Sequence, residues 1–259
     1  MNAPTAQHTA AQPTATLESL STVAMTKSFG GVTAVDGATV TFQEGKVNGL
    51  IGPNGSGKTT FFNCVTGMIK PDSGEVRYRG QAITRKSPDR IARAGIGRSF
   101  QLCRVFPRMT VMENLLVAVR STSIRQQLRS AHDPDELERA RGWLRRVGID
   151  HLEHAEARNL SYGQQKLLEL AGVLMGEPDT IMLDEPAGGV NPALIGRIAT
   201  LVRELNDEGK TFIIVEHNME MVMSLCDHVV VFDRGRQIAE GTPEIIQQDP
   251  RVLEAYLGV

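Results

Sequence analysis

The glycine-rich segment 52–59 constrains the fold of this chain more than any other stretch. It follows the apolar run Val47–Ile51, which is typical of a buried strand, and it precedes a segment typical of a helix start. Glycines adopt positive φ at little cost, so successive backbone N–H groups can turn onto anionic oxygens beside the positive end of that helix. An ordinary glycine-rich turn is the alternative, but the complete G-x-x-x-x-G-K-[ST] spacing favours a phosphate-binding loop. The residues assigned to this phosphate loop are Gly52, Pro53, Asn54, Gly55, Ser56, Gly57, Lys58, Thr59 and Thr60.

Two side chains at the end of the loop carry chemistry of their own. Lys58 offers a positive charge to the outer phosphates of a nucleoside triphosphate, and the hydroxyl of Thr59 suits a Mg²⁺ ion. The loop by itself indicates nucleotide binding and no particular reaction.

Composition describes an ordinary globular protein. The chain has 259 residues, 41% of them apolar, with a formal net charge of −2, and nothing in this balance suggests nucleic acid as a partner. Arginines gather between residues 77 and 146; solvated helix faces explain them more simply than a surface for anionic lipid or nucleic acid. The three cysteines are unpatterned, which indicates neither a disulfide framework nor a zinc site and fits a reducing cytoplasm.

The N-terminal stretch 1–20 is expected to be a disordered tail, because Met1–Thr16 is rich in Ala, Thr, Gln and Pro. It lacks the basic residues and the continuous apolar run of a secretory signal, and it does not resemble a transit peptide. No run approaches the roughly eighteen apolar residues of a membrane span, so a membrane role would depend on a partner.

Apolar runs and helical periodicities alternate along the chain, which predicts an α/β fold with a mostly parallel sheet covered on both faces. Ser21–Thr26 and Ala38–Phe42 predict a small N-terminal antiparallel β subdomain, with turns at Gly30-Gly31 and Asp36-Gly37. Helical patterns without strands between residues 101 and 170 predict an inserted α-helical subdomain. The strands expected in the main sheet are Val47–Ile51, Ile96–Phe100, Thr180–Leu183, Thr211–Val215 and Val229–Phe232.

Polar residues follow several of these strands, where parallel sheets bind their ligands. Asp184 follows a buried strand and is suited to anchor a Mg²⁺ ion that Thr59 also holds. The adjacent Glu185 is the candidate for polarising an attacking water molecule. A charged exit from the strand is the alternative for this pair, and the residues alone leave His217 as a plain strand-end histidine.

Taken together, these motifs resemble the ATP-binding subunit of an ABC transporter over residues 22–259. The resemblance implies a P-loop NTPase (RecA-like) core in one ATPase domain spanning residues 21–259, with ATP and Mg²⁺ as its cofactors. The motifs that carry it, in chain order, are Gly52–Thr59, Gln101, Leu160–Gln164, Ile181–Pro186 and His217.

The resemblance also assigns roles to single residues. Phe29, which the residues alone leave as either a core or a stacking side chain, matches the aromatic that stacks on adenine. Gln101 matches a glutamine that binds Mg²⁺ and water in the joint between the core and the helical subdomain. His217 matches the switch histidine that contacts the γ-phosphate.

A fourth motif points to a shared site. Ser161, Gly163 and Gln164 match the signature motif, which in the family binds ATP held by the other subunit of a head-to-tail dimer. Ser161 is also the expected N-cap of a helix, and a helix N-terminus suits a phosphate. Tyr162 and Asn191 depart from the commonest family pattern, which leaves the contacts across the dimer less determined than the ATP site.

Segments 97–101, 109–116, 215–219 and 252–258 are similar to the larger ATPase of branched-chain amino acid importers. This similarity implies transmembrane permease subunits as partners, a substrate-binding protein that acts indirectly, and a peripheral position on the cytoplasmic face of the inner (plasma) membrane. The two ATPases could be identical or related. Urea or amide importers and a soluble ATPase of iron–sulfur assembly remain alternatives, whereas Glu185 and His217 argue against a non-hydrolysing adaptor. Leu102–Asn114 is the expected permease-docking surface.

Overall fold

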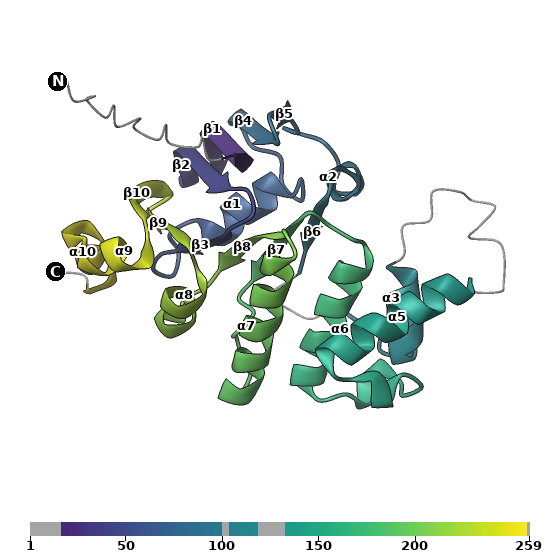
Figure 1. Ribbon diagram of the computed structural model, residues 1–259. Coiled ribbons are helices and arrows are strands. Elements are labelled where there is room, and N and C mark those ends of the chain that lie inside the picture. The colour runs from purple at the N-terminus through teal and green to yellow at the C-terminus, as the bar shows by residue number, and fades with distance from the viewer. Residues whose placement is uncertain (1–16, 100–103, 119–132, 258–259) are drawn as a thin grey trace, which may run out of the picture.

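The computed structural model describes residues 17–99, 104–118 and 133–257. Its centre is a six-stranded sheet in the order β10-β9-β3-β8-β7-β6 (Figure 1). Strands β9, β3, β8, β7 and β6 run parallel, and only β10 pairs antiparallel, at one edge. The mostly parallel sheet predicted from the sequence is therefore confirmed. The strands are β3 (Val47–Ile51), β6 (Ile96–Arg98), β7 (Thr180–Asp184), β8 (Thr211–Val215), β9 (His228–Asp233) and β10 (Arg236–Gly241).

A second, antiparallel sheet forms the N-terminal β subdomain, in the order β2-β1-β4-β5. The predicted turn at Gly30-Gly31 is confirmed, but Asp36-Gly37 lies inside a strand, because the long pairing with β1 overrides the local turn signal and leaves a register shift. Residues 18–20, assigned to the tail, belong to β1, where Leu20 is fully buried. The strands are β1 (Glu18–Phe29), β2 (Val32–Gln43), β4 (Ser73–Tyr78) and β5 (Gln81–Ala82).

Side chains of the central strands alternate between two apolar cores, one on each face of the six-stranded sheet. In β8, Phe212 and Ile214 belong to one core, whereas Ile213 and Val215 belong to the other. Strands buried on both faces read as continuous apolar runs, which is why this sheet was visible in the sequence.

The second core lies between the two sheets and contains helix α1. The ring of Phe61 packs edge-on against Phe42 of β2 and Phe232 of β9, with ring centroids 6.2 Å and 5.2 Å apart. This packing holds the helix that follows the phosphate loop against both sheets.

Helices α3, α5 and α6 pack on one another beside the sheet (Figure 1). Capping boxes start α3 at Thr110 and α6 at Ser161, which confirms the predicted N-cap at Ser161. The sequence patterns left β10 and α8–α10 unassigned. Among the described residues, no helix has the length and apolar character needed to cross a membrane. The helices are α1 (Lys58–Val65), α2 (Pro88–Ala94), α3 (Val111–Val117), α5 (Pro134–Val147), α6 (Tyr162–Met175), α7 (Pro192–Asp207), α8 (Met219–Leu225), α9 (Pro243–Gln248), α10 (Pro250–Leu257), and the 3-10 turns Asp150–Leu152 and Ala157–Asn159.

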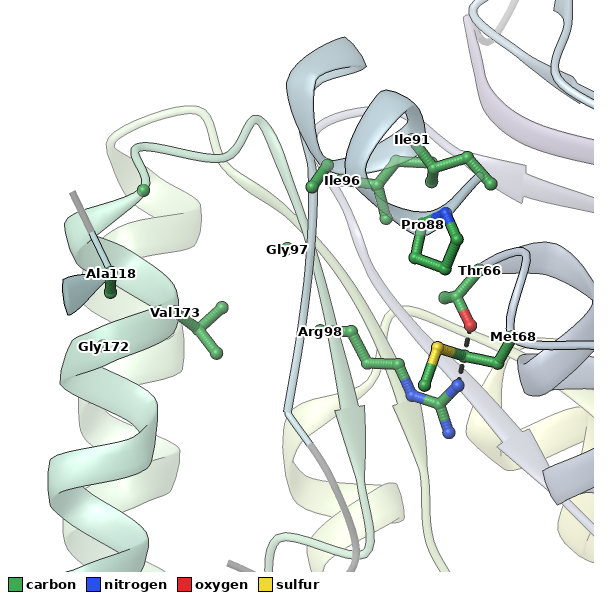
Figure 2. A pocket seen from close by; sticks show the side chains of 12 residues that line it. Thr66, Met68, Pro88, Ile91, Ile96, Gly97, Arg98, Ala118, Gly172 and Val173 are labelled. Atoms are coloured by element: carbon green, nitrogen blue, oxygen red, sulfur yellow. Dashed lines mark hydrogen bonds between the residues drawn. The ribbon is translucent and has the colours of Figure 1, made fainter. Parts of the chain in front are cut away.

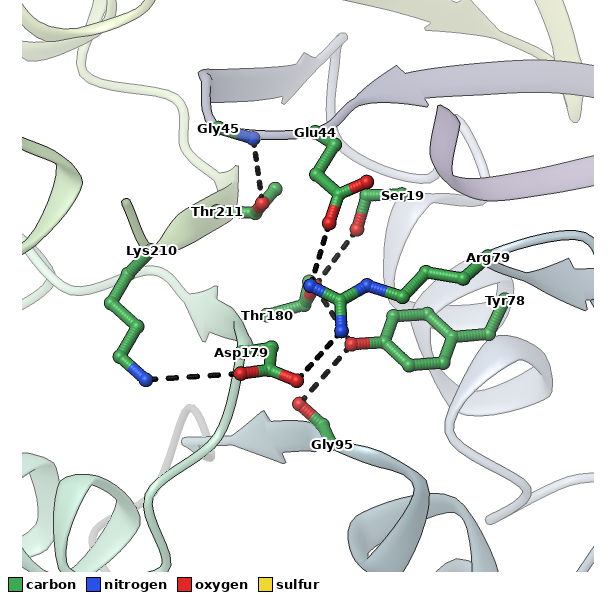
Figure 3. Close-up of polar contacts among 10 residues, drawn as sticks. All are labelled: Ser19, Glu44, Gly45, Tyr78, Arg79, Gly95, Asp179, Thr180, Lys210 and Thr211. Atoms are coloured by element: carbon green, nitrogen blue, oxygen red, sulfur yellow. Dashed lines mark hydrogen bonds and ion pairs between the residues drawn. The ribbon is translucent and has the colours of Figure 1, made fainter. Parts of the chain in front are cut away.

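Polar contacts join the two sheets at the amino-terminal ends of β7 and β8 (Figure 3). Arg79 donates from Nη1 to Asp179 at 2.8 Å and pairs through Nη2 with Glu44 at 2.6 Å. The buried hydroxyls of Ser19 and Thr180 lie 2.8 Å apart. Because the phosphate loop follows the carboxyl end of β3, this network braces the opposite end of the sheet.

Candidate functional site

The phosphate loop connects the carboxyl end of β3 to α1, as the sequence predicts. Gly52 has a φ of 149°, and a Cβ there would clash with the carbonyl of Phe232 in β9. Gly57 has a φ of 100°, and a Cβ there would clash with the carbonyl of Ala34 in β2. The loop therefore needs glycine at both positions, because two strands press against its backbone.

The N-terminus of α1 is open to an anion. The N-cap position of α1 is Gly57, so no side chain of the described loop binds the first N–H groups of the helix. The first turn also carries no acidic residue. Asn54, Gly55 and Thr59 are exposed at the surface. A helix end of this kind attracts phosphate through its unpaired N–H groups and its dipole.

Lys58 is almost fully buried under this loop. Its Nζ donates hydrogen bonds to the carbonyl oxygens of Gly52 and Pro53 at 2.7 Å and 2.9 Å. Burial lowers the pKa of the Lys58 ammonium, and the negative charges of Glu185 and Asp184 partly oppose this shift. The structure thus brings Lys58 near both predicted carboxylates.

Asp184 ends β7, and 2% of its side chain is exposed. Burial raises the pKa of its carboxyl, while the charge and the hydrogen bond of Arg98 oppose the rise. Oδ2 accepts from Nη2 of Arg98 at 3.0 Å, but Oδ1 is buried with no hydrogen-bond partner among the described residues. An orphaned carboxylate oxygen is costly unless something binds it, and it fits a hard divalent cation such as Mg²⁺.

Arg98, which lies in β6, is assigned no role by the sequence motifs. Besides Asp184, its guanidinium donates to Asn63 and Thr66 of the segment that follows the phosphate loop, at 2.8 Å and 2.7 Å. Arg98 therefore links the metal candidate Asp184 to the far end of α1. The only available signal was a single cation inside an otherwise apolar strand.

Glu185 follows β7 with an unusual backbone φ of 50°. Its N–H donates to the carbonyl of Val215 in β8 at 2.9 Å, and its carbonyl accepts from Nζ of Lys166 at 2.8 Å. Non-glycine residues held at positive φ concentrate at functional sites, because the surrounding structure must compensate for the strain.

His217 lies beyond the end of β8, next to Glu185. Its Nδ1 is 3.9 Å from Oε1 of Glu185, and 58% of its side chain is exposed compared with 23% for Glu185. The predicted catalytic side chains of Glu185 and His217 therefore meet at the same end of the sheet as the phosphate loop, whereas the third, Gln101, lies outside the described residues. The preceding Glu216, to which the sequence motifs assign no role, is completely buried, and the hydrogen bonds it accepts from described residues come from backbone N–H groups.

The signature residues begin α6. Ser161 Oγ accepts from the N–H of Gln164, and Gln164 Oε1 accepts from the N–H of Ser161. A Cβ on Gly163 would press on Leu194 of α7, so this helix start lies against the element that follows β7. Across the described parts of the chain, no hydrogen bond joins Ser161, Gly163 or Gln164 to the chain's own phosphate loop.

Phe29 ends β1 with 47% of its surface exposed, and Nζ of Lys27 lies 5.2 Å from its ring centroid. An exposed ring is available for stacking, which disfavours the core alternative. Gln101, the remaining predicted site residue, lies outside the described residues.

The C-terminal helix α10 reaches the phosphate loop. Tyr256 lies near the backbone of Gly52, which opposes the rise in the pKa of Tyr256 that partial burial causes. The contact joins the last helix to the first residue of the loop.

A largely apolar groove of about 280 Å³ lies where β6 meets α2, α6 and the end of α1 (Figure 2). Val173 of α6 faces Ile91 and Pro88 of α2 across it, and Arg98 lies along it. Because Arg98 binds both Thr66 and Asp184, a side chain of the groove touches the candidate metal site directly.

Comparison with known proteins decides the family. A model described as "ABC transporter" matches residues 35–188, more than half of the chain. The high-affinity branched-chain amino acid transport ATP-binding protein BraF of Pseudomonas aeruginosa is 40% identical, over 90% of this chain and 95% of the relative. The chain belongs to the ABC transporter family. It is an ATP-binding cassette, an ATPase whose turnover drives transport.

Solved structures agree with this assignment. A nucleotide-free ATP-binding cassette from an ABC transporter matches the chain with a TM-score of 0.84 and 37% identity, covering 94% of this chain and all (100%) of the other. The ADP conformation of such a cassette matches with a TM-score of 0.83 and 37% identity, covering 94% and 100%. The P-loop NTPase core, the antiparallel β subdomain and the accompanying helices are thereby confirmed as an ABC ATPase fold. A model described as "Branched-chain amino acid ATP-binding cassette transporter" matches residues 236–259.

Proposed function

We propose that this cassette powers the import of branched-chain or related amino acids through a membrane permease. The match of residues 236–259 to the branched-chain amino acid cassette model carries the proposal. The name of the relative BraF, a branched-chain amino acid transport protein, supports it. Importers of urea or amides form the second substrate class to test.

Uptake assays in the source organism test which class of substrate the transporter imports. Deleting the gene should abolish uptake of labelled leucine, isoleucine and valine, and the parent gene, but not a Lys58→Ala variant, should restore it. Loss of urea uptake with normal leucine uptake would move the cassette to the second class. Normal uptake of both, with the chain isolated free of any polytopic membrane protein, would support a soluble ATPase instead.

In this proposal the phosphate loop binds the phosphates of ATP. The open N-terminus of α1 supplies N–H groups, and Lys58 turns its ammonium from the loop carbonyls to the outer phosphates. Phe29 stacks on the adenine. The exposure of Phe29 and the apolar packing that fixes α1 support this arrangement.

Thr59, Asp184 and Gln101 hold Mg²⁺. The orphaned Oδ1 of Asp184 supports its part in this set, since its other oxygen is already bound by Arg98. The ion supplies positive charge that offsets the negative charge developing on the phosphoryl group. Arg98 keeps Asp184 charged and fixed in direction.

Glu185 acts as general base. Its carboxylate accepts a proton from the water molecule whose oxygen attacks the γ-phosphorus, and the bond to the ADP oxygen breaks to give ADP and phosphate. His217 contacts the γ-phosphate from the end of β8. The Glu185→Gln variant should bind ATP like the parent, and its rate of ATP hydrolysis should be about 10²- to 10⁴-fold lower. Hydrolysis by the Glu185→Gln variant at the parent rate would show that Glu185 is not the general base.

The ATP site is completed by a partner ATPase in a head-to-tail dimer. The exposed Ser161 at the start of α6, together with Gly163 and Gln164, binds the γ-phosphate of ATP held on the partner. Gel filtration of Glu185→Gln with MgATP should show a dimer, and adding Ser161→Arg should leave a monomer that still binds ATP. Dimer formation only with a second, related ATPase would make the assembly a heterodimer.

The groove between α2 and α6 receives an apolar segment of the permease. This occupant fits its apolar walls and would act on Asp184 through Arg98. The sequence predicts Leu102–Asn114 as the docking surface; the first two residues of this segment lie outside the described residues, and Phe106 is 51% exposed. Val173→Glu should uncouple transport while the isolated cassette still hydrolyses ATP, whereas Ile245→Glu on distant α9 should not. Coupled transport by the Val173→Glu variant would show that the groove is not the permease-docking site.

Binding to the permease would hold the cassette on the cytoplasmic face of the inner membrane. The substrate-binding protein would meet the permease and not this chain. Nucleic acid has no part in the proposal.

A further inference from the structure

Glu216 is a completely buried carboxylate that binds two segments of the candidate site at once. Its Oε1 accepts a hydrogen bond from the N–H of Ala187 at 2.6 Å. Its Oε2 accepts from the N–H groups of His217 at 3.0 Å and Asn218 at 3.1 Å. Three backbone N–H groups of the described chain therefore satisfy this carboxylate, as a buried charge requires.

The place of Glu216 in the sheet explains why it can reach both segments. Strand β8 lies between β3 and β7, so the first residue after β8 stands between the strand that leads to the phosphate loop and the strand that leads to Asp184. The N–H of Glu216 donates to Leu50 of β3 at 3.4 Å, while its side chain reaches Ala187, which follows β7. One residue therefore connects the ends of three neighbouring strands.

The two segments that Glu216 joins carry two of the predicted catalytic side chains, Glu185 and His217. Ala187 belongs to a tight turn in which the N–H of Gly188 donates to the carbonyl of Glu185 at 3.0 Å. His217 and Asn218 begin the segment that leads into α8. The Glu185 and His217 side chains lie 3.9 Å apart, and Glu216 binds the backbone beside each of them.

We propose that Glu216 is a positioning residue that fixes the turn of Glu185 relative to the backbone of His217, and so sets the geometry in which ATP is hydrolysed. The inference rests on the proposed roles of Glu185 and His217. Glu216 itself does not contact the nucleotide or the attacking water; it acts through the two backbones. Hydrolysis is sensitive to small displacements of the groups around the reacting atoms, so loss of the bridge should slow the chemical step more than it weakens ATP binding.

Glutamine has nearly the same volume as glutamate but cannot make the same bridge. Its amide oxygen can accept from Ala187 or from His217 and Asn218, but its NH₂ group then faces N–H donors on the other side. Aspartate keeps the charge but is one methylene shorter, so it cannot reach both segments at once. Two different substitutions therefore break the same link.

The experiment measures steady-state ATP hydrolysis, ATP affinity and thermal unfolding of the full chain. Glu216→Gln and Glu216→Asp should each lower kcat by at least ~10-fold, with KM within about threefold of the parent. The matched control is Asp227→Asn, because Oδ2 of Asp227 accepts from the N–H of Val47 at 2.8 Å, at the opposite end of β3. This control should shift the unfolding temperature without changing kcat. A double variant with His217→Ala should lose less than the product of the two single losses, since both changes act on the same group.

The outcomes separate this inference from the proposed function. If the parent and Asp227→Asn hydrolyse ATP, Glu185→Gln does not, and both Glu216 variants match the parent, the positioning role is overturned and the proposed function stands. Loss of kcat in proportion to unfolding, with the same loss in Asp227→Asn, would make Glu216 merely structural. Full turnover by Glu185→Gln would overturn the proposed role of Glu185, on which this inference rests.

Discussion

Arg98 and Asp184 form a nearly completely buried ion pair, with Nη2 of Arg98 3.0 Å from Oδ2 of Asp184. The arginine comes from β6 and the aspartate from the neighbouring strand β7. Arg98 also faces the groove between α2 and α6, so one guanidinium contacts both the candidate metal site and the proposed permease surface.

Replacing Arg98 by alanine should strongly destabilise the fold, because it leaves the Asp184 carboxylate buried without its cation. Removing one partner of a buried pair typically costs about 3–5 kcal/mol of unfolding free energy. Urea unfolding monitored by circular dichroism measures this loss. The control Arg251→Ala removes an exposed arginine paired with Asp249 and should leave the urea midpoint where it is in the parent. Equal midpoints for Arg98→Ala and the parent would contradict this account.

Features of the site that depend on local backbone chemistry were readable from the sequence. Ser161 was recognisable as an N-cap because a serine followed three residues later by Gln164 forms a capping box within one turn. The glycines of the phosphate loop were recognisable because their spacing reports positive φ and close backbone approach. Strands buried on both faces showed themselves as unbroken apolar runs.

Features that depend on distant partners were not readable. Arg98 meets Asp184, 86 residues away in sequence, and Glu216 meets Ala187, 29 residues away. Asp36-Gly37 carried a real turn signal, but pairing between β1 and β2 outweighed it. Such contacts arise only when the sheet order is known, because the order decides which strand ends become neighbours.

Gly57→Ala should impair both folding and ATP binding. The new Cβ would clash with the carbonyl of Ala34, which belongs to β2 and cannot move without disturbing the sheet. Gly209→Ala is the matched control: Gly209 also has a positive φ, of 92°, but a Cβ there meets open space, so only the backbone penalty of about 1–2 kcal/mol applies. Calorimetric titration should show lost ATP binding in Gly57→Ala and normal binding in Gly209→Ala. Normal binding in both would mean that the loop tolerates the clash.

Lys58→Ala should weaken ATP binding. The variant loses charge-assisted hydrogen bonds to the phosphates, each worth about 1.5–3 kcal/mol, so the Kd should rise about 10- to 150-fold. Equilibrium binding of a fluorescent ATP analogue measures the change. Lys70→Ala, an exposed lysine beyond α1, serves as control and should bind like the parent. An unchanged Kd in Lys58→Ala would contradict the assignment of the phosphate loop.

The buried thiols of Cys64 and Cys226 should make the fold less stable in alkali. Burial raises the pKa of Cys64 to about 11 and that of Cys226 to about 12, from 9.0. The folded state therefore holds these protons more tightly than the unfolded chain. Their contribution to stability is complete below pH 9 and disappears as the pH rises toward these folded pKa values.

Urea unfolding at pH 8, 9 and 10 tests this dependence. The fall in unfolding free energy above pH 9 should be smaller in Cys226→Ala than in the parent, although the variant is less stable at every pH. Peptide mapping after iodoacetamide treatment at pH 8 should find both cysteines unmodified in the folded chain and modified in urea. Parallel pH curves for parent and variant, or modification of the folded chain, would show that these thiols are accessible.

Tyr256→Phe should weaken ATP binding although Tyr256 lies in the last helix, 204 residues beyond Gly52 in sequence. The change removes the hydroxyl that interacts with the backbone of Gly52, and leaves the ring. A lost hydrogen bond of this kind costs about 0.5–1.5 kcal/mol, which corresponds to a two- to tenfold rise in Kd if the bond holds the loop ready for phosphate. Tyr78→Phe is the matched control, because its hydroxyl lies 3.3 Å from that of Thr180 at the opposite end of the sheet. Both variants should lose a similar amount of unfolding free energy, but only Tyr256→Phe should bind ATP more weakly. Equal ATP affinity in the two variants would mean that α10 contributes to packing and not to ATP binding.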